Sequence, residues 1–581
     1  MKKKVIVLGG GVAGMSAAHE LAERGFDVEV YEQNEYYVGG KARSVDVPGT
    51  NLLHPDKYLP GEHGFRFFPG FYKHVTDTMK RIPFKKDEKV SNCFQNLVPT
   101  SRIMLARYDL PPVVFPASFP RSIKDIKLIL SDLSGKLNTG LSKDEIEFFA
   151  ARIWQCMTSS KLRKFEEYEK ISWWDFMEAD RFSDAYRHLL VEGLTRSLVA
   201  ARAEVASMKT GSSVTLQLMY CMWDPTVNTD RVLNGPTNDQ WLLPWLAYLK
   251  EKGVKYHHGY KVSKILLNDK KPDGVLVTDK SGKTEKVTGD YYILAVPVEQ
   301  AVTLVNDDMI KADSSLGTLE QLNKSTAWMN GIQYYLNEDV QISEGHVCYS
   351  YSQWAVTSIS QMQFWKGYDI EKRYNGKVKG VLSVDISDWL YTQYKGEYAE
   401  NCDPQTIMKY TWEQIKKSVN IDGKEILRDD MIEYWYLDRD IKWNGAKHKN
   451  EDAEPLLINS VNSWALRPEA RTQIPGFYLA ADYVRTNTDL ATMEGANEAA
   501  RRAVNSIIDD SGINAPFCKI WDLHEPALFL PLKWWDERRF KKGLKWSSKF
   551  PFWLDIFMVI WSGCYLMLIT IYLVLIKIIK K

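Results

Sequence analysis

The chain opens with an apolar segment that predicts a buried strand. Residues 4–8 end in an uninterrupted run of Val, Ile, Val and Leu, the pattern of a parallel strand covered on both faces. Residues 13–24 then place apolar side chains at helical spacing, and residues 26–31 alternate as a second strand does. This order of strand, helix and strand is typical of an α/β lobe built on a parallel sheet.

A glycine-rich turn joins the first strand to the helix with the spacing G-x-G-x-x-G at Gly9, Gly11 and Gly14. Gly9 permits the tight turn, Gly11 lets the backbone approach a pyrophosphate, and Gly14 packs the helix close to the sheet. Glu32 follows at the ~20-residue spacing at which a carboxylate meets the ribose of a dinucleotide. The helix N-terminus adds free N–H groups for phosphate, so we predict a dinucleotide site that residues 477–501 complete.

A basic turn and an aromatic loop follow the second strand. Residues 38–43 contain two adjacent glycines with Lys41 and Arg43 close behind. Exposed backbone N–H groups together with positive charge predict a second contact to the dinucleotide. Residues 61–72 form a loop rich in glycine and aromatic side chains, which we expect beside the same ligand.

The remaining pattern divides the chain into segments. We expect residues 76–245 to be largely helical, residues 252–297 to form strands, and residues 300–470 to mix helices with aromatic-rich strands. The predicted organisation is three dinucleotide-binding segments (1–75, 246–300 and 471–510), a mostly helical substrate- or membrane-facing segment (76–245), a substrate domain with a β-sheet (301–470), a basic aromatic tail (511–553) and an apolar helix (554–578).

The stretch from Ile556 to Ile576 is uncharged and almost wholly apolar. As a helix it would span about 31 Å, which matches the hydrocarbon core of a bilayer. Aromatic and basic residues precede it, as in a membrane headgroup layer, and the six Lys and Arg of residues 538–549 outnumber the three beyond the stretch. We therefore predict a bilayer partner and a single-pass C-terminal anchor, with the large N-terminal body in the cytoplasm.

Composition excludes several other classes of protein. Lys and Arg number 75 against 74 Asp and Glu, and a formal charge of +1 gives no global field that would recruit nucleic acid. The seven cysteines lack metal-like spacing, and the His257–His258 pair lies in a strand-like surface segment, so we predict no metal site. Scattered Ser, His and Asp residues form no nucleophile elbow, which argues against hydrolysis.

The quoted motifs resemble the superfamily of FAD-dependent amine oxidases and carotenoid desaturases. The resemblance covers most of residues 1–510 and is most specific at residues 5–43, 290–297 and 477–503. Residues 39–41 and 65–72 look more like plant-type phytoene and zeta-carotene desaturases than amine oxidases. Residues 233–242, with a strand expected after them, are similar to a desaturase element, but Gln240 stands where those enzymes carry arginine. Ala481 replaces the usual glycine before Asp482.

The resemblance implies an α/β fold in which a Rossmann-like FAD-binding domain carries an inserted mixed α+β substrate domain, and the C-terminal transmembrane helix is added to it. FAD is the implied cofactor. Its implied contacts are Gly9, Gly11, Val12, Ala13 and Gly14 at the pyrophosphate, Glu32 at the ribose, Lys41 and Arg43 along the diphosphate and ribityl chain, Val262 at the adenine, Asp482 near the ribityl chain, Met493 and Glu494 at a helix start facing the flavin, and in addition Gln33, Gly40, Ala42, Gly64 and Phe65.

The resemblance further implies an oxidoreductase that desaturates an isoprenoid, carotenoid-like or other lipid and passes electrons to a quinone or to oxygen. His63 and Arg66 are the candidate catalytic residues, because a loop histidine beside the flavin could move a proton at neutral pH. Glu62 could equally be a ribityl ligand. Three alternatives stay open: a hydroxysqualene dehydroxylase-like or saturating reductase, a flavin amine oxidase, and a non-enzymatic escort-type protein that binds a lipid or prenyl group.

Overall fold

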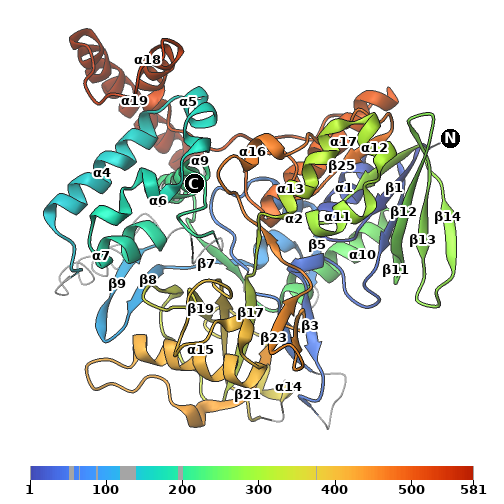
Figure 1. Cartoon of the computed structure of the whole chain (residues 1–581), viewed down its shortest axis with the longest axis horizontal. Helices are drawn as coiled ribbons and strands as arrows, with labels where there is room; N and C mark the ends of the chain where they lie inside the picture. The colour runs from blue at the N-terminus through green and yellow to red at the C-terminus, as the bar shows by residue number, and fades with distance from the viewer. Residues whose placement is uncertain are drawn as a thin grey trace.

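The computed structural model describes residues 2–51, 58–64, 66–86, 89–117, 139–193, 196, 201–224, 226–374 and 376–579, with the backbone alone for 86, 89 and 572–579. Three regions are visible in Figure 1: a lobe around a parallel sheet at the upper right, a lobe around a larger sheet below it, and a helical layer at the upper left. The chain enters the first lobe three times.

The first lobe is built on a five-stranded parallel sheet with the order β11-β2-β1-β15-β25. Strand β1 is apolar after Lys4, and both β1 and β2 are buried beyond their first residue, because helices cover the sheet on both faces. The strand bounds are β1 Lys4–Leu8, β2 Asp27–Glu32, β11 Lys255–His258, β15 Tyr291–Leu294 and β25 Phe477–Leu479. The helices of this lobe are α1 Val12–Glu23, α2 His74–Arg81, α10 Leu243–Glu251, α11 Val298–Leu304, α12 Asp307–Ala312, α13 Leu319–Asn323 and α17 Met493–Ser511. A three-stranded antiparallel sheet extends the lobe: β12 Lys261–Asn268, β13 Lys271–Thr278 and β14 Thr284–Val287.

The second lobe contains a seven-stranded sheet with the order β21-β17-β20-β19-β18-β8-β9. All neighbours are antiparallel except β8 and β18, which run parallel. Helix α15 (Pro404–Val419) packs on this sheet over a core that includes Trp354, Trp389 and Trp412. The strand bounds are β8 Arg102–Arg107, β9 Leu110–Pro116, β17 Asn330–Leu336, β18 Gly345–Tyr349, β19 Val356–Ser360, β20 Gly380–Ile386 and β21 Ile432–Leu437.

The expectation that residues 76–245 are largely helical is wrong for residues 83–116, which form five strands. Apart from β8 and β9 these are β5 Pro83–Lys86, β6 Lys89–Asn92 and β7 Leu97–Pro99. Strand β9 contains Pro111, Pro112 and Pro116, which lack the N–H needed inside a sheet. The sheet accommodates them because β9 is its edge strand, where unpaired positions face away from the ladder.

The helical layer packs on the C-terminal segment. Helix α4 (Lys143–Thr158) starts with a capping box in which Ser142 and Glu145 satisfy each other's backbone N–H groups. Residues 511–553, expected as a tail, instead include α18 (Leu530–Lys541), which contacts α4 and α5 (Lys161–Glu166). The layer also contains α6 Trp173–Phe176, α7 Asp184–Tyr186 and α9 Met208–Trp223.

The final helix, α19 (Phe552–Ile579), holds the expected apolar stretch. Among the described residues, its Phe552–Ile571 part is the one segment long and apolar enough to cross a membrane, with a mean hydropathy of 2.0. Only 6% of that window is buried against the rest of the chain. This exposure separates α19 from a core helix of the same composition; length and composition alone do not place it in a bilayer.

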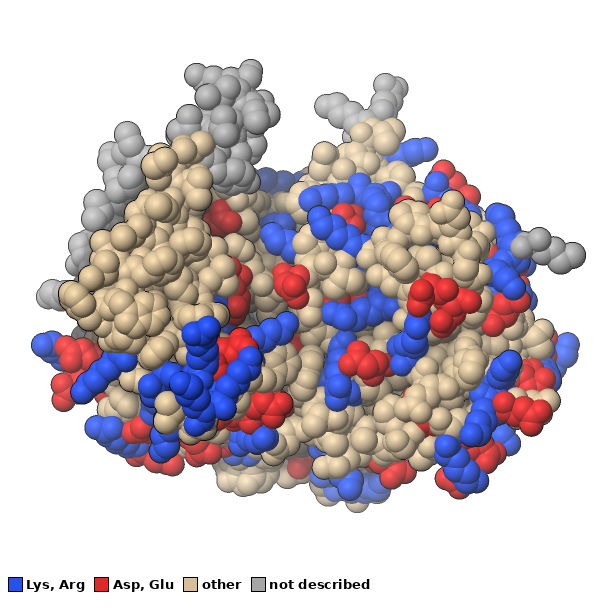
Figure 2. Space-filling view, turned by 90° about the horizontal axis from the view of Figure 1, so that it is seen from above, with Lys and Arg blue, Asp and Glu red and all other residues tan. Residues whose placement is uncertain are grey.

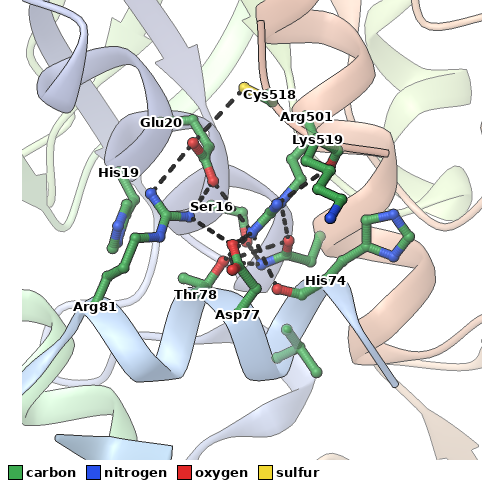
Figure 3. Close-up of polar contacts among 12 residues, drawn as sticks. Ser16, His19, Glu20, His74, Asp77, Thr78, Arg81, Arg501, Cys518 and Lys519 are labelled. Atoms are coloured by element: carbon green, nitrogen blue, oxygen red, sulfur yellow. Dashed lines mark hydrogen bonds and ion pairs between the residues drawn. The ribbon is translucent and has the colours of Figure 1, made fainter. Parts of the chain in front are cut away.

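A buried ion network ties α1, α2 and α17 together behind the glycine turn (Figure 3). The Arg501 guanidinium of α17 lies 2.8 Å from Asp77 of α2 and 3.2 Å from Glu20 of α1. Burial would raise the pKa of Glu20, but Arg501 and Arg81 outweigh it and lower the pKa to about 2. Because Glu20 would be left as a buried, partly uncompensated charge, loss of Arg501 is expected to cost about 3–5 kcal/mol.

Candidate functional site

A cavity of about 730 Å³ lies between the two lobes. Its walls come from the β1–α1 turn, the basic turn, the ends of β2, β15 and β25, the start of α17, helix α9 and the large sheet. The predicted site residues that line it are Gly9, Gly11, Val12, Ala13, Glu32, Gln33, Gly40, Lys41, Ala42, Arg43, His63, Gly64, Arg66, Val262, Asp482 and Met493. Phe65 lies outside the described residues.

The three glycines of the first turn have different surroundings. A Cβ on Gly9 would lie 2.6 Å from Ala295 O, and the backbone there has a φ of +103°, so both space and conformation favour glycine. A Cβ on Gly14 would lie 1.9 Å from Gly9 O, and Gly14 therefore packs α1 against the turn and does not line the cavity. At Gly11 the nearest atom would be Gly40 Cα at 3.8 Å. Protein packing therefore leaves room at Gly11, on the cavity wall.

Glu32 closes the far side of this turn. Its carboxylate accepts hydrogen bonds from the N–H groups of Gly10 at 2.6 Å and Asn34 at 2.7 Å. Burial raises the pKa of Glu32 in spite of these two bonds. The side chain is thus held at the end of β2 with its carboxylate on the cavity wall, where a ribose diol could donate to it.

The basic turn is neutralised by carboxylates from elsewhere in the chain. Lys41 Nζ lies 2.9 Å from Glu299, and Arg43 binds Asp440 at 2.6 Å and Glu454 at 3.0 Å. Burial would lower the pKa of Lys41, but the negative charge of Glu299 outweighs it and the pKa is raised. Because both cations are already paired, the backbone N–H groups at the start of α1 are the better donors for a phosphate.

Donor atoms of His63, Asp440 and Glu454 lie within 4.8 Å of one another, a spacing that a metal ion could bridge. Arg43 binds both carboxylates of this group. The guanidinium therefore supplies the positive charge that the two carboxylates require, and the group is explained without a metal.

Asp482 and Glu494, the two acidic residues in the C-terminal part of the expected site, have different roles. Asp482 lines the cavity, and its buried Oδ1 accepts no hydrogen bond from the part of the chain that the structure describes. Glu494 does not line the cavity. Its carboxylate accepts from the N–H groups of Lys73, His74 and Val75, and so caps the start of α2. The expected flavin contact at Glu494 is therefore corrected to a contact with α2, while its neighbour Met493 stays on the cavity wall.

The candidate catalytic loop brings His63 and Arg66 to the cavity. His63 Nδ1 lies 2.5 Å from Asp438, although the angle departs from that of a regular hydrogen bond. Burial would lower the pKa of His63, but Asp438 outweighs it and the pKa is raised. Arg66 donates to Lys41 O at 2.9 Å, and burial lowers its pKa.

Glu62 and Gln240 do not line the cavity. Glu62 accepts two hydrogen bonds from Thr237, each of 2.9 Å, lies off the cavity wall, and has a pKa that burial raises to about 7. Gln240 also lies off the wall, and the strands expected after this element begin with β11, beyond helix α10. The departure at Gln240 thus does not change the cavity lining.

Sequence reasoning missed one histidine of the cavity wall. His346 of β18 lines the cavity, and its Nδ1 lies 2.5 Å from Asp230 Oδ2. Thr100 donates to the same carboxylate at 2.8 Å, so the buried Asp230 is held in place. Asp385 of β20 lies on the same wall. No sequence spacing could have revealed this group, because its members come from strands and loops that only the folded sheet brings together.

The first lobe has a parallel sheet with a glycine turn directly after its central strand β1, and a cavity separates this turn from the second lobe. These features define a two-lobed dinucleotide-dependent protein. Comparison with known families is consistent with this: residues 12–508 match the family described as flavin-containing amine oxidoreductase. The chain belongs to this family. It is an FAD-dependent oxidoreductase with a mixed α/β fold.

The most informative relatives are carotenoid enzymes matched over part of their length. The zeta-carotene desaturase of Synechocystis sp. is 22% identical over 306 residues, covering 51% of this chain and 58% of that protein. The 4,4'-diaponeurosporene oxygenase of Staphylococcus haemolyticus is 46% identical over 48 residues, 8% of this chain and 9% of the other. The chain therefore matches less than two thirds of the length of these curated relatives.

Solved structures share the fold over most of the chain. An oxidoreductase from Methanosarcina mazei has a TM-score of 0.54 at 14% identity, covering 87% of this chain and 100% of that one. Cyclohexylamine oxidase from Brevibacterium oxydans has a TM-score of 0.56 at 12% identity, covering 88% and 100%. At these identities the likeness concerns the fold.

The residues present fit FAD on three independent observations. Gly11 leaves open space beside the N-terminus of α1, where no side chain caps the helix. Asp482 presents a buried acceptor to the cavity, and Glu32 stands at the end of β2. These features suit a pyrophosphate, a ribityl hydroxyl and a ribose diol respectively.

Proposed function

We propose that the protein is a membrane-anchored, FAD-dependent desaturase of an isoprenoid, carotenoid-like or other lipid. One observation carries this proposal: α9 is shared by the cavity and the C-terminal segment. Thr210, Gly211 and Val214 of α9 line the cavity. Leu216 and Tyr220 of the same helix pack in one apolar cluster with residues of the C-terminal segment, namely Phe529, Leu532 and Leu554.

This arrangement suits an apolar substrate that arrives from a bilayer. Each CH₂ group kept out of water on the way to the cavity avoids a cost of about 0.8 kcal/mol. The matched carotenoid enzymes lend support, since the names of two of them refer to apolar isoprenoids. In this proposal α19 crosses the membrane, residues 538–549 lie on its cytoplasmic side, and segments 1–75, 246–300 and 471–510 hold the cofactor.

Bound FAD would supply hydride-accepting chemistry, and the electrons would leave to a quinone or to oxygen. Gly9, Gly11, Val12 and Ala13 would hold the pyrophosphate, and Glu32 the ribose. The chain's own chemical task is to remove a proton from the substrate and to exclude water. His346 is suited to that task, because it lines the cavity and Asp230 holds its imidazole through Nδ1.

A second candidate is oxidation of an amine. The wall that carries His63, Arg66, His346 and Asp385 is more polar than a hydrocarbon alone requires. Oxidation of an amine would give an imine that water hydrolyses to a carbonyl product, whereas a desaturated polyene would gain absorbance at longer wavelength; with oxygen as the acceptor, either reaction would also give hydrogen peroxide.

Lipid analysis of cells that lack the protein tests the main proposal. We expect a more saturated isoprenoid or related lipid to accumulate and its unsaturated product to vanish, and an active-site variant of His346 should reproduce this profile. If only amines change, amine oxidation takes its place.

A further inference from the structure

Helix α18 has one face buried in the body and one face left open. Leu532, Lys533 and Asp536 are buried against the helical layer. On the other side Leu530 is 53% exposed and Trp534 is 46% exposed, and the Arg538 guanidinium lies 3.6 Å from the centre of the Trp534 ring. Leu530, Trp534 and Arg538 thus lie one turn apart on the exposed side, and tryptophan and basic side chains of this kind are enriched at membrane interfaces.

Neighbouring elements enlarge this face. Trp154 of α4 is exposed and contacts the ring of Phe529, directly before α18. Trp553 at the start of α19 is also exposed and contacts Trp535 of α18. The exposed aromatic and apolar side chains thus reach from α4 across α18 to the first turn of the candidate span. We call this surface the α18 face.

Positive charge borders the α18 face. Lys and Arg side chains gather beside an uncharged area at the left of the molecule in Figure 2, which views the top of Figure 1. In sequence, residues 537–549 contain six cations, Arg538, Arg539, Lys541, Lys542, Lys545 and Lys549, against Glu537 as the one acidic residue. Lys541 pairs with Glu537 at 2.5 Å, which leaves a clear excess of positive charge.

We propose that the α18 face docks in the headgroup layer of a bilayer that contains anionic lipid. Aromatic side chains prefer this depth, and each basic residue near such a surface is attracted to it. The inference rests on the membrane anchoring proposed above for α19 but not on the chemistry of the cavity. It adds a second contact that orients the body on the membrane, which a single helix joined by a free tail would not do.

Buried polar contacts make that orientation rigid. Arg163 of α5 has a fully buried side chain and donates to Asp536 of α18 at 2.9 Å, while Ser160 N donates to the same carboxylate at 2.8 Å. Arg163 also donates to Leu544 O at 2.9 Å, beyond the end of α18. Since α5 belongs to the helical layer around the cavity wall, the height of the cavity above the membrane is set by α18.

Fluorophores on introduced cysteines of the full-length protein test this docking, since six of its seven cysteines are buried and only Cys564 is exposed. In a Cys564→Ser background, Leu530→Cys reports on the α18 face, Met567→Cys on the exposed side of α19, and Tyr36→Cys on a 74% exposed site of the nucleotide lobe. Each variant is labelled with an environment-sensitive fluorophore and reconstituted in vesicles of phosphatidylcholine with or without phosphatidylglycerol. Iodide quenching and emission wavelength measure contact with water.

In vesicles with phosphatidylglycerol, we expect iodide to quench the label at Leu530 several-fold less than the label at Tyr36. Without phosphatidylglycerol this difference in quenching should be smaller. The triple variant Lys541→Glu, Lys542→Glu, Lys545→Glu should abolish this dependence on lipid charge while Met567 stays in lipid. If iodide quenches the Leu530 label as much as the Tyr36 label while the Met567 label is in lipid, the docking is overturned and the anchoring stays intact. A Met567 label that stays in contact with water would contradict the anchoring by α19 and, with it, the docking that rests on that anchoring. Protection of Leu530 by heparin but not by anionic vesicles would also overturn the proposal.

Discussion

Substitution of Gly11 by alanine separates cofactor binding from folding. The backbone of Gly11 has a φ of −69°, which alanine adopts without strain, and the added Cβ would meet no atom closer than 3.8 Å. The new methyl group therefore finds room in the protein but occupies the cavity wall where a pyrophosphate would approach. We expect the folded protein to form and FAD to bind poorly.

The structure sets the scale of both effects. Alanine is a poorer N-cap than glycine, so the variant without FAD should lose no more than about 1 kcal/mol. Loss of one charge-assisted hydrogen bond to phosphate costs about 1.5–3 kcal/mol, or roughly 10- to 150-fold in Kd. Gly14→Ala is the contrasting variant, since its Cβ would lie 1.9 Å from Gly9 O. Forcing α1 away from the turn should cost about 1–3 kcal/mol without FAD.

Thermal unfolding with and without FAD, together with a fluorescence titration of FAD, measures these quantities. At an FAD concentration of about 100 times its Kd, the wild-type protein gains roughly 2.7 kcal/mol, and Gly11→Ala should lose most of that gain. Wild-type affinity in Gly11→Ala would refute the placement of the pyrophosphate at this turn.

Three further substitutions address the buried polar groups. Burial raises the pKa of Glu62 from 4.5 to about 7, so stability present below about pH 4.5 is lost as the pH rises through 7. Glu62→Gln keeps the bond from Thr237 N through its one amide oxygen, and its Nε2 can donate to Thr237 Oγ1 in place of the second bond. The variant should stabilise the protein at pH 8 by about 3 kcal/mol and at pH 4.5 by little, as measured by urea unfolding; equal gains at both pH values would contradict this. His346→Gln should lower kcat about 100-fold with FAD affinity unchanged, and Asp230→Asn should lower it less; a wild-type kcat in His346→Gln would remove this residue from the reaction.

Sequence alone predicted the parts of the site that depend on local geometry. The strand at residues 4–8, the turn at Gly9 and the acid at Glu32 follow one another within a short stretch, so spacing was enough to place them together. Sixteen of the predicted residues line one cavity, including Asp482 from the far end of the chain. Motif resemblance supplied that long-range link, which periodicity could not.

The errors arose where tertiary contacts override local pattern. Strand β9 carries three prolines, for which turns around residues 111–121 of a largely helical region were expected, and its place at a sheet edge accommodates them as a strand. Glu494 follows Met493 at the start of α17, yet the open N-terminus of α2 captures its carboxylate. His346 and Asp230 are separated by 116 positions and meet only because β18 lies beside the cavity.

The most direct test of the central claim is anaerobic reduction of the purified, FAD-loaded protein by candidate substrates, followed through the long-wavelength absorption band of the flavin. The account predicts that a partly saturated polyene isoprenoid bleaches this band and is recovered with one more double bond, whereas primary amines leave the band unchanged. Bleaching by amines and none by any isoprenoid or other lipid would contradict it.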